Sequence, residues 1–134
     1  MRVVAVVGGF DPLHIGHYEH IRKAKSLGDY LIVIVGRDEV IEKKRGKSVL
    51  IPHQKLRMIN VLSLPWVDAV VATIDKDGTC AETLKMIRPD VFAKGGDRTP
   101  DRMPQNEILA CKEIGCEIVY GVGEQLYSSR NVRR

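Results

Sequence analysis

The sequence predicts an α/β protein: a single Rossmann-like, doubly wound parallel sheet of five strands with helices on both faces. Two observations predict it. Short runs of β-branched and apolar residues recur along the chain, as is typical of parallel strands that are buried on both faces. Helical stretches alternate with these runs, and such alternation favours right-handed crossovers between parallel strands. The length of 134 residues fits one domain, 1–134.

The first β-α-β unit has the clearest pattern. Apolar runs at 2–7 and 30–35 predict two central strands. Between them, apolar positions from Tyr18 to Leu27 predict a helix, and Gly28 is a typical stop signal just beyond it. The same alternation then predicts helices at 52–62, 79–87 and 104–115 and strands at 67–74, 90–94 and 116–120.

The segments that follow the strands contain most of the glycines and unusual polar residues. In a doubly wound sheet, ligands bind at the carboxyl ends of the strands, where the strand order reverses. We therefore expect the functional site among the segments 8–17, 36–47, 75–78, 95–102 and 121–130.

Composition limits the classes of partner. The net charge is +4 and the pI is about 9.1, but the basic residues are scattered and aromatic residues make up only 5%. A single-stranded nucleic acid platform needs aromatic side chains, so we expect a basic surface for polyanionic small ligands and no nucleic acid partner. No apolar run approaches the roughly 20 residues of a membrane span, which predicts a cytoplasmic protein without membrane contact.

The segment 8–17 reads GGFDPLHIGH. Gly8 and Gly9 allow a ligand close to the backbone, and the helix start that follows offers amides and a positive dipole end. In a helix, His14 and His17 share one side, and Gly16 leaves room beside them. Paired histidines can also face solvent or bind zinc. Because no cysteine or carboxylate set lies near to complete a zinc site, we interpret the segment as a phosphate site.

These residues carry a family resemblance. The G-x-F-D turn with Phe10 and Asp11, followed by H-x-G-H, is similar to the mark of the cytidylyltransferase-like nucleotidyltransferase superfamily, and the similarity extends over essentially the whole chain. Class I aminoacyl-tRNA synthetases share H-I-G-H, but they carry tRNA machinery and a K-M-S-K-S segment that this sequence lacks. The resemblance implies transfer of a nucleoside monophosphate from a triphosphate to a phosphorylated small molecule, with Mg²⁺ carried by the triphosphate, in a homodimer.

A basic cluster follows the second strand. Among 43–47, a lysine or arginine is expected to reach the triphosphate, and we assign Lys44 and Lys47 a catalytic contact, although such a run can also be a solvated loop. Asp38 could hydrogen-bond a ligand hydroxyl or cap a turn. Arg57 could order the basic loop or touch phosphate. Asp11 could orient His17 or a turn amide, with a nucleotide contact as the further alternative.

The loops after the fourth and fifth strands should select the substrates. Lys94, Gly95 and Asp97 belong to K-G-G-D, which is similar to the adenylyltransferase domain of the bifunctional heptose-phosphate enzymes. The start of the chain looks as much like the archaeal FMN adenylyltransferases. In the last loop, the phosphate-binding candidates are Ser128, Ser129 and Arg130, with a simple helix cap as the alternative for the serines.

Other functions fit the sequence less well. Glycerol-phosphate cytidylyltransferases end in R-T-x-G-I-S-T-T, whereas 123–129 reads GEQLYSS, which places ATP ahead of CTP as the donor without excluding CTP. A dinucleotide oxidoreductase needs G-x-G-x-x-G after the first strand, and GGFDP does not match it. A nucleotide-binding module without catalysis stays open as an alternative.

Overall fold

The computed structural model describes residues 1–48, 50, 53–96 and 98–123. A parallel sheet with the strand order β3-β2-β1-β4-β5 forms its centre, which confirms the predicted α/β class and the five parallel strands. The second strand has the predicted bounds, the first is shifted by one residue, and the other three are shorter than predicted at both ends. The strands are β1 (Val3–Gly8), β2 (Tyr30–Val35), β3 (Ala69–Ala72), β4 (Val91–Ala93) and β5 (Glu117–Val119).

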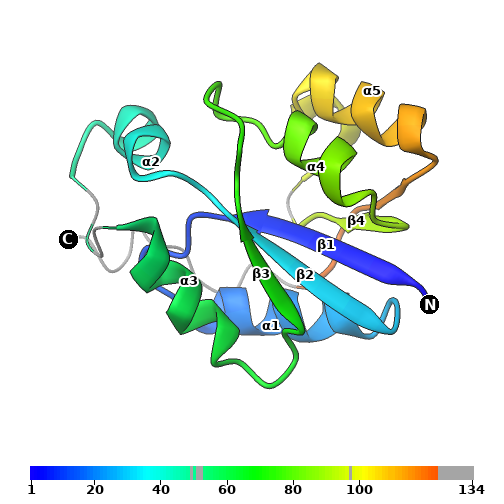
Figure 1. Ribbon diagram of the computed structural model, residues 1–134, viewed down its shortest axis with the longest axis horizontal. Coiled ribbons are helices and arrows are strands. Elements are labelled where there is room, and N and C mark those ends of the chain that lie inside the picture. Colours follow the sequence, from blue (N-terminus) through cyan, green and yellow to red (C-terminus); the bar gives the residue numbers. More distant parts are fainter. Residues whose placement is uncertain (49, 51–52, 97, 124–134) are drawn as a thin grey trace.

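Two pairs of helices cover the two faces of the sheet, as predicted (Figure 1). On one face lie α1 (Ile15–Lys25) and α3 (Gln54–Leu62). On the other lie α4 (Ala81–Ile87) and α5 (Gln105–Ile114). None of the helices that the structure describes has the length and apolarity needed to cross a bilayer.

The strands supply both cores because successive side chains of a strand point to opposite faces. From β1, Val4 and Val6 pack in the cluster that contains Ile21 of α1 and Val61 of α3. Ala5, between them, packs in the second cluster. That second cluster also contains Leu84 of α4, Phe92 of β4 and Cys111 of α5. Each helix pair is therefore held by its own apolar layer, and the sheet is common to both.

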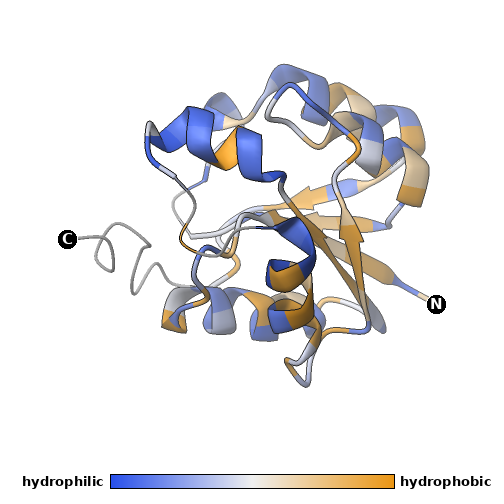
Figure 2. Cartoon of the chain, turned by 60° about the vertical axis from the view of Figure 1, so that its left-hand side comes forward, coloured by the Kyte–Doolittle hydropathy of each residue, from blue (hydrophilic) through white to orange (hydrophobic). Residues whose placement is uncertain are grey.

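The segment 36–47, predicted as a loop, contains an additional helix, α2 (Asp38–Arg45). Its sequence contains helix signals, but the cluster of charged residues led to the prediction of a loop. Acidic residues occupy its first turn, basic residues occupy its last, and Gly46 ends it at φ 69°. Only Ile41 is buried, so α2 appears hydrophilic except for one short apolar stretch (Figure 2). A short 3₁₀ turn, η1 (Pro100–Arg102), likewise lies inside a predicted loop.

The strand order places the candidate site. From β1 the chain proceeds outward to β2 and β3, and it then returns to β4 on the other side of β1. The segments after β1 and β4 consequently diverge at the carboxyl edge, which is where doubly wound sheets bind ligands.

Candidate active site

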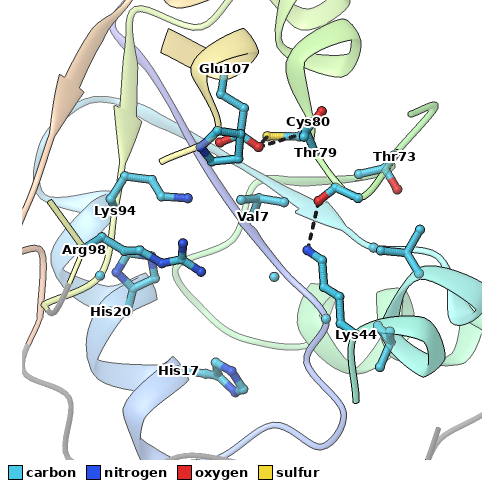
Figure 3. Close-up of a pocket in the computed structure, with 18 of the residues that line it drawn as sticks. Val7, His17, His20, Lys44, Thr73, Thr79, Cys80, Lys94, Arg98 and Glu107 are labelled. Atoms are coloured by element: carbon cyan, nitrogen blue, oxygen red, sulfur yellow. Dashed lines mark hydrogen bonds between the residues drawn. The ribbon is translucent and has the colours of Figure 1, made fainter. Parts of the chain in front are cut away.

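A cavity of about 1060 Å³ opens at the carboxyl edge of the sheet. Its volume slightly exceeds the roughly 300 to 1,000 Å³ that is usual for ligand pockets. Figure 3 shows some of the wall residues: His17 lies at one end, Lys44 on one side, and His20, Arg98 and Lys94 on the opposite side. The predicted loops therefore do meet around one space.

His14 and His17 form the start of α1. His14 is the N-cap residue, and its Nδ1 accepts a hydrogen bond from the Gly16 amide at 3.1 Å. His17 returns the contact, because its Nδ1 accepts from the His14 amide at 3.3 Å. The two rings stack with their centroids 3.8 Å apart. The predicted arrangement on one side of the helix is confirmed, and both residues line the cavity.

These contacts fix the tautomers. A ring nitrogen that accepts an amide hydrogen bond carries no proton, so each neutral imidazole has its proton on Nε2. The pKa of His17 is lowered to about 3, mainly by burial and to a smaller extent by the neighbouring His14, His20 and Arg45. Burial also lowers the pKa of His14. The pair thus presents uncharged N–H donors at neutral pH.

Phe10 holds the loop under the histidines. Its ring is buried and meets His17 edge to face, with the centroids 4.9 Å apart. A Cβ added to Gly8 would lie 2.8 Å from the Phe10 ring, so glycine is needed there because of the phenylalanine. Gly9 similarly faces the side chain of Ile41 at 3.0 Å. Both glycines also line the cavity, and their contact with a ligand stays a prediction.

Asp11 joins this loop to the end of α2. Its carboxylate is fully buried and accepts from Arg45 Nη1 at 3.1 Å and from the Leu50 amide at 2.8 Å. Arg45 also donates to the Asp11 carbonyl oxygen at 3.0 Å. Asp11 is absent from the described cavity wall, and the amide that it binds belongs to the distant Leu50 rather than to its own turn.

Arg57 and Asp38 lie beneath the site. Arg57 is 0% exposed, donates from Nη1 to the Gly9 carbonyl oxygen at 2.7 Å and pairs through Nη2 with Asp38. Asp38 also accepts from the His53 amide at 2.7 Å. Neither residue belongs to the described cavity wall, and a substrate contact of either one stays a prediction. The Arg57 guanidinium, which comes from α3, binds the backbone of the first loop at Gly9.

Three residues of the basic cluster belong to the last turn of α2, and Lys47 follows the Gly46 that ends the helix. Lys44, Arg45 and Lys47 line the cavity, and Lys43 is not part of its described wall. Lys44 Nζ donates to the Gly78 carbonyl oxygen at 2.9 Å, so it bridges from α2 to the turn after β3.

Lys94 follows β4 on the opposite wall. It is only 7% exposed, and its Nζ lies 4.7 Å from the centre of the Phe92 ring. Burial lowers the pKa of Lys94. Gly95 and Gly96 continue this wall. The other predicted nucleotide contacts, Asp97, Ser128, Ser129 and Arg130, lie outside the described residues.

Several wall residues were missed from the sequence. His20 repeats the three-residue spacing of His14 and His17, which was a usable signal. Glu107 is 4% exposed and accepts from the Cys80 amide at 3.0 Å, but a glutamate in a predicted helix carries no such signal. Arg98 also lines the cavity. Among residues 1–48, 50, 53–96 and 98–123, no three His, Cys, Asp or Glu side chains are grouped to hold a metal ion.

Residues 5–134 match the model of a protein family described as cytidylyltransferase-like. The chain belongs to this family. Membership confirms the resemblance read from the first loop, and with it the prediction of a nucleotidyltransferase.

Two relatives represent the two groups named from the sequence. The chain is similar to the FAD synthase of Pyrococcus abyssi, with 37% identity over 120 residues, 88% of this chain and 79% of that protein. It is also similar to the bifunctional protein HldE of Nitratiruptor, with 42% identity over 96 residues, 72% of this chain. The match spans only 20% of that longer cytidylyltransferase-like relative.

A solved structure has the same fold. The lipopolysaccharide core biosynthesis protein from Thermoplasma volcanium superposes with a TM-score of 0.74 at 27% identity, covering 96% of this chain and 99% of that one. The cytidylyltransferase-like chain therefore has a Rossmann-like structural neighbour over nearly its full length.

Proposed function

We propose that this nucleotidyltransferase moves AMP from ATP to the phosphate of a small molecule and releases pyrophosphate. The observation that carries the proposal is the stacked pair of neutral imidazoles, His14 and His17, on the wall of a large cavity. An acceptor phosphate oxygen forms a bond to the α-phosphorus while the bond from that phosphorus to the bridging oxygen breaks. The electron pair leaves on pyrophosphate, and no covalent enzyme intermediate forms.

Each group of described side chains has its own role in this reaction. Nε2–H of His17, with His14 beside it, would donate to the α-phosphate and bridging oxygens, where charge builds in the transition state. Lys44 and Lys47 would hold the leaving pyrophosphate, and Arg45 keeps α2 against the first loop. In-line displacement needs mainly positioning and charge stabilisation, which these groups supply.

Magnesium is proposed to enter with the triphosphate. Mg²⁺ is usually held by substrate phosphates, waters and one or two carboxylates, so a large protein ligand set is not required. The carboxylate of Asp75, on the cavity wall, already accepts from the Glu82 and Thr83 amides at 2.8 Å and 3.0 Å. The ion would neutralise charge on the phosphates.

The donor and the acceptor are the finer part of the proposal. The K-G-G-D segment and the two groups of relatives support ATP, because an FAD synthase by its name makes an adenylated flavin. Two acceptors follow: a sugar phosphate, supported by the resemblance to the heptose-phosphate enzymes, and FMN, supported by the 79% coverage of the Pyrococcus abyssi FAD synthase. A homodimer and a cytoplasmic location stay predictions.

Pyrophosphate release tests the proposal. Each of ATP, CTP, GTP and UTP is incubated with Mg²⁺ and with FMN, sugar 1-phosphates, polyol phosphates or phosphonates. Release with ATP and one acceptor is the expected result. Preference for CTP would support a cytidylyltransferase, and tight triphosphate binding without release under any combination would support a non-catalytic module.

A further inference from the structure

A third histidine, His20 of α1, lines the same cavity as His14 and His17. His20 lies three residues beyond His17, and its Nδ1 is 2.6 Å from the Val122 carbonyl oxygen. A carbonyl oxygen can only accept, so Nδ1 of His20 must carry the proton. In the neutral ring, Nε2 then has a lone pair. No described residue donates a hydrogen bond to it.

The contact that fixes this tautomer is built by the backbone. Gly123 has φ 89°, and a Cβ added there would lie 2.9 Å from the His20 Cα, so only glycine lets this segment rest on α1. The Val122 amide donates to the Lys94 carbonyl oxygen at 2.9 Å. The chain after β5 is thus held between the end of β4 and α1, with the Val122 carbonyl directed at His20.

The surroundings keep the ring of His20 neutral. Burial lowers its pKa, the hydrogen bond to Val122 opposes this shift, and the positive charge of Lys94 lowers the pKa again. Lys94 and Arg98 stand beside His20 on one wall of the cavity (Figure 3). Protonation of Nε2 would place one more positive charge beside these cations, which disfavours it.

The hydrogen-bonding role of Nε2 in His20 is therefore the opposite of its role in His14 and His17. His14 and His17 carry a proton on Nε2 and donate, whereas His20 accepts at Nε2. Three residues advance a helix by about 4.5 Å, so the acceptor lies roughly that far along the helix axis from His17. An ionised phosphate oxygen has no proton to give and is repelled by a lone pair. The group bound at His20 must come from an uncharged part of the ligand that carries O–H or N–H.

We propose that Nε2 of His20 accepts a hydrogen bond from the nucleoside part of the triphosphate. This inference rests on the proposed function. The donor is a ribose hydroxyl or the exocyclic amino group of the base. At the position of that amino group in adenine or cytosine, guanine and uracil carry a carbonyl oxygen, which would oppose the lone pair. If the base is the source, His20 favours ATP and CTP over GTP and UTP.

The His20→Asn variant separates the acceptor from the backbone contact. The asparagine amide can still donate to the Val122 carbonyl oxygen, but it offers no acceptor where Nε2 stood. Tyr18→Phe, on the exposed side of the same helix, is the matched control. Both variants and the unmodified protein are assayed for pyrophosphate release with ATP, 2′-deoxy-ATP, 3′-deoxy-ATP and inosine triphosphate.

We expect His20→Asn to lower kcat/KM for ATP roughly three- to tenfold, the effect of one neutral hydrogen bond. The analogue that lacks the donor should lose the same factor in the unmodified protein and nothing more in His20→Asn. That analogue identifies the source as a ribose hydroxyl or the base amino group. An equal loss with all four triphosphates, or no loss, would overturn the inference.

Measuring triphosphate binding separates the test of the His20 assignment from the test of the proposed function. If the unmodified protein binds ATP but releases no pyrophosphate, the proposed function fails, and the dissociation constants of the same four triphosphates decide the assignment of His20. If pyrophosphate is released and His20→Asn discriminates among the analogues as the unmodified protein does, only the assignment of His20 fails. A protein that binds no triphosphate would overturn both.

Discussion

The first and second loops at the carboxyl edge are built in opposite ways. Residues 8–17 are anchored from below, by the buried Phe10 ring, the buried Asp11 carboxylate and the Arg57 guanidinium on the Gly9 carbonyl oxygen. Residues 36–47 form a helix with one buried side chain, Ile41, and expose lysines at its end. The first loop is attached to the core, whereas the second rests on the first.

This difference fits the two tasks that we propose for the site. Groups that stabilise a transition state must be held in place before the substrate arrives, because reorganisation at that moment costs rate. Groups that bind a mobile polyphosphate tolerate freedom, and long lysine side chains provide it. We therefore expect substitutions under the first loop to affect folding and catalysis strongly, and substitutions on α2 to have smaller effects, mainly on substrate binding.

The largest effect is expected from Arg57→Met. The change leaves the Gly9 carbonyl oxygen and Asp38 without their buried cation, and breaking a buried pair costs about 3 to 5 kcal/mol. Urea denaturation measures the free energy of unfolding. The double variant Arg57→Met with Asp38→Asn should recover part of the loss, because no charge is then left unpaired. A loss below 1 kcal/mol would show that the first loop does not depend on α3.

His17→Ala should lower kcat at least roughly a hundredfold, about 2.7 kcal/mol, while the fold remains. The physical reason is the loss of the Nε2–H donor on the cavity wall. Pyrophosphate release gives the rate. His17→Gln is the control, since glutamine at this helix position preserves the capping contact with the His14 amide without an imidazole. Unchanged turnover in His17→Ala would remove His17 from the mechanism.

Acid should destabilise the protein through the same residue. The pKa of His17 is about 3 in the folded state and 6.5 when unperturbed, so between these values the unfolded chain binds more protons. The free energy of unfolding therefore falls as the pH drops below 6.5, by about 2 kcal/mol at pH 5 for this group. Urea denaturation at pH 7.5 and 5.0 should show it, and His17→Gln should reduce the difference. Equal stability at both values contradicts a buried neutral imidazole.

The smallest effect is expected on α2. Lys44→Ala removes a cation from the cavity wall and its bond to the Gly78 carbonyl oxygen, and should raise KM for the triphosphate up to about tenfold. The free energy of unfolding should change by less than about 0.5 kcal/mol. Lys43→Ala, whose side chain is not on the described wall, is the matched control. Equal effects of the two substitutions would mean that only the net charge of α2 matters.

The sequence predicted what depends on local pattern. Apolar runs identified the five strands, and the spacing of His14, Gly16 and His17 identified the helix start. It did not predict α2, whose acidic first turn, basic last turn and Gly46 were read as a charged loop. Local helix signals were present there, but the single apolar residue gave no periodicity to confirm them.

Other features depend on contacts between distant segments. Arg57 was expected to order the basic loop or touch phosphate, and its burial under Gly9 arises from the packing of α3 against β2 and β3, which no local pattern encodes. The tautomer of His20 depends on Val122, 102 positions later. Charges and spacing reveal which residues are available to a site, but the direction of each hydrogen bond requires the fold.

The separate apolar layers also bear on how such enzymes diversify. The histidine pair lies at the start of α1, which packs on the first cluster, whereas Glu107 lies on α5, which packs on the second cluster together with Cys80. Mutations that reshape the second layer leave the packing beneath the phosphate chemistry intact. A lineage could in this way exchange one substrate for another in small steps, and a laboratory library confined to α4, α5 and their preceding turns is the corresponding engineering strategy.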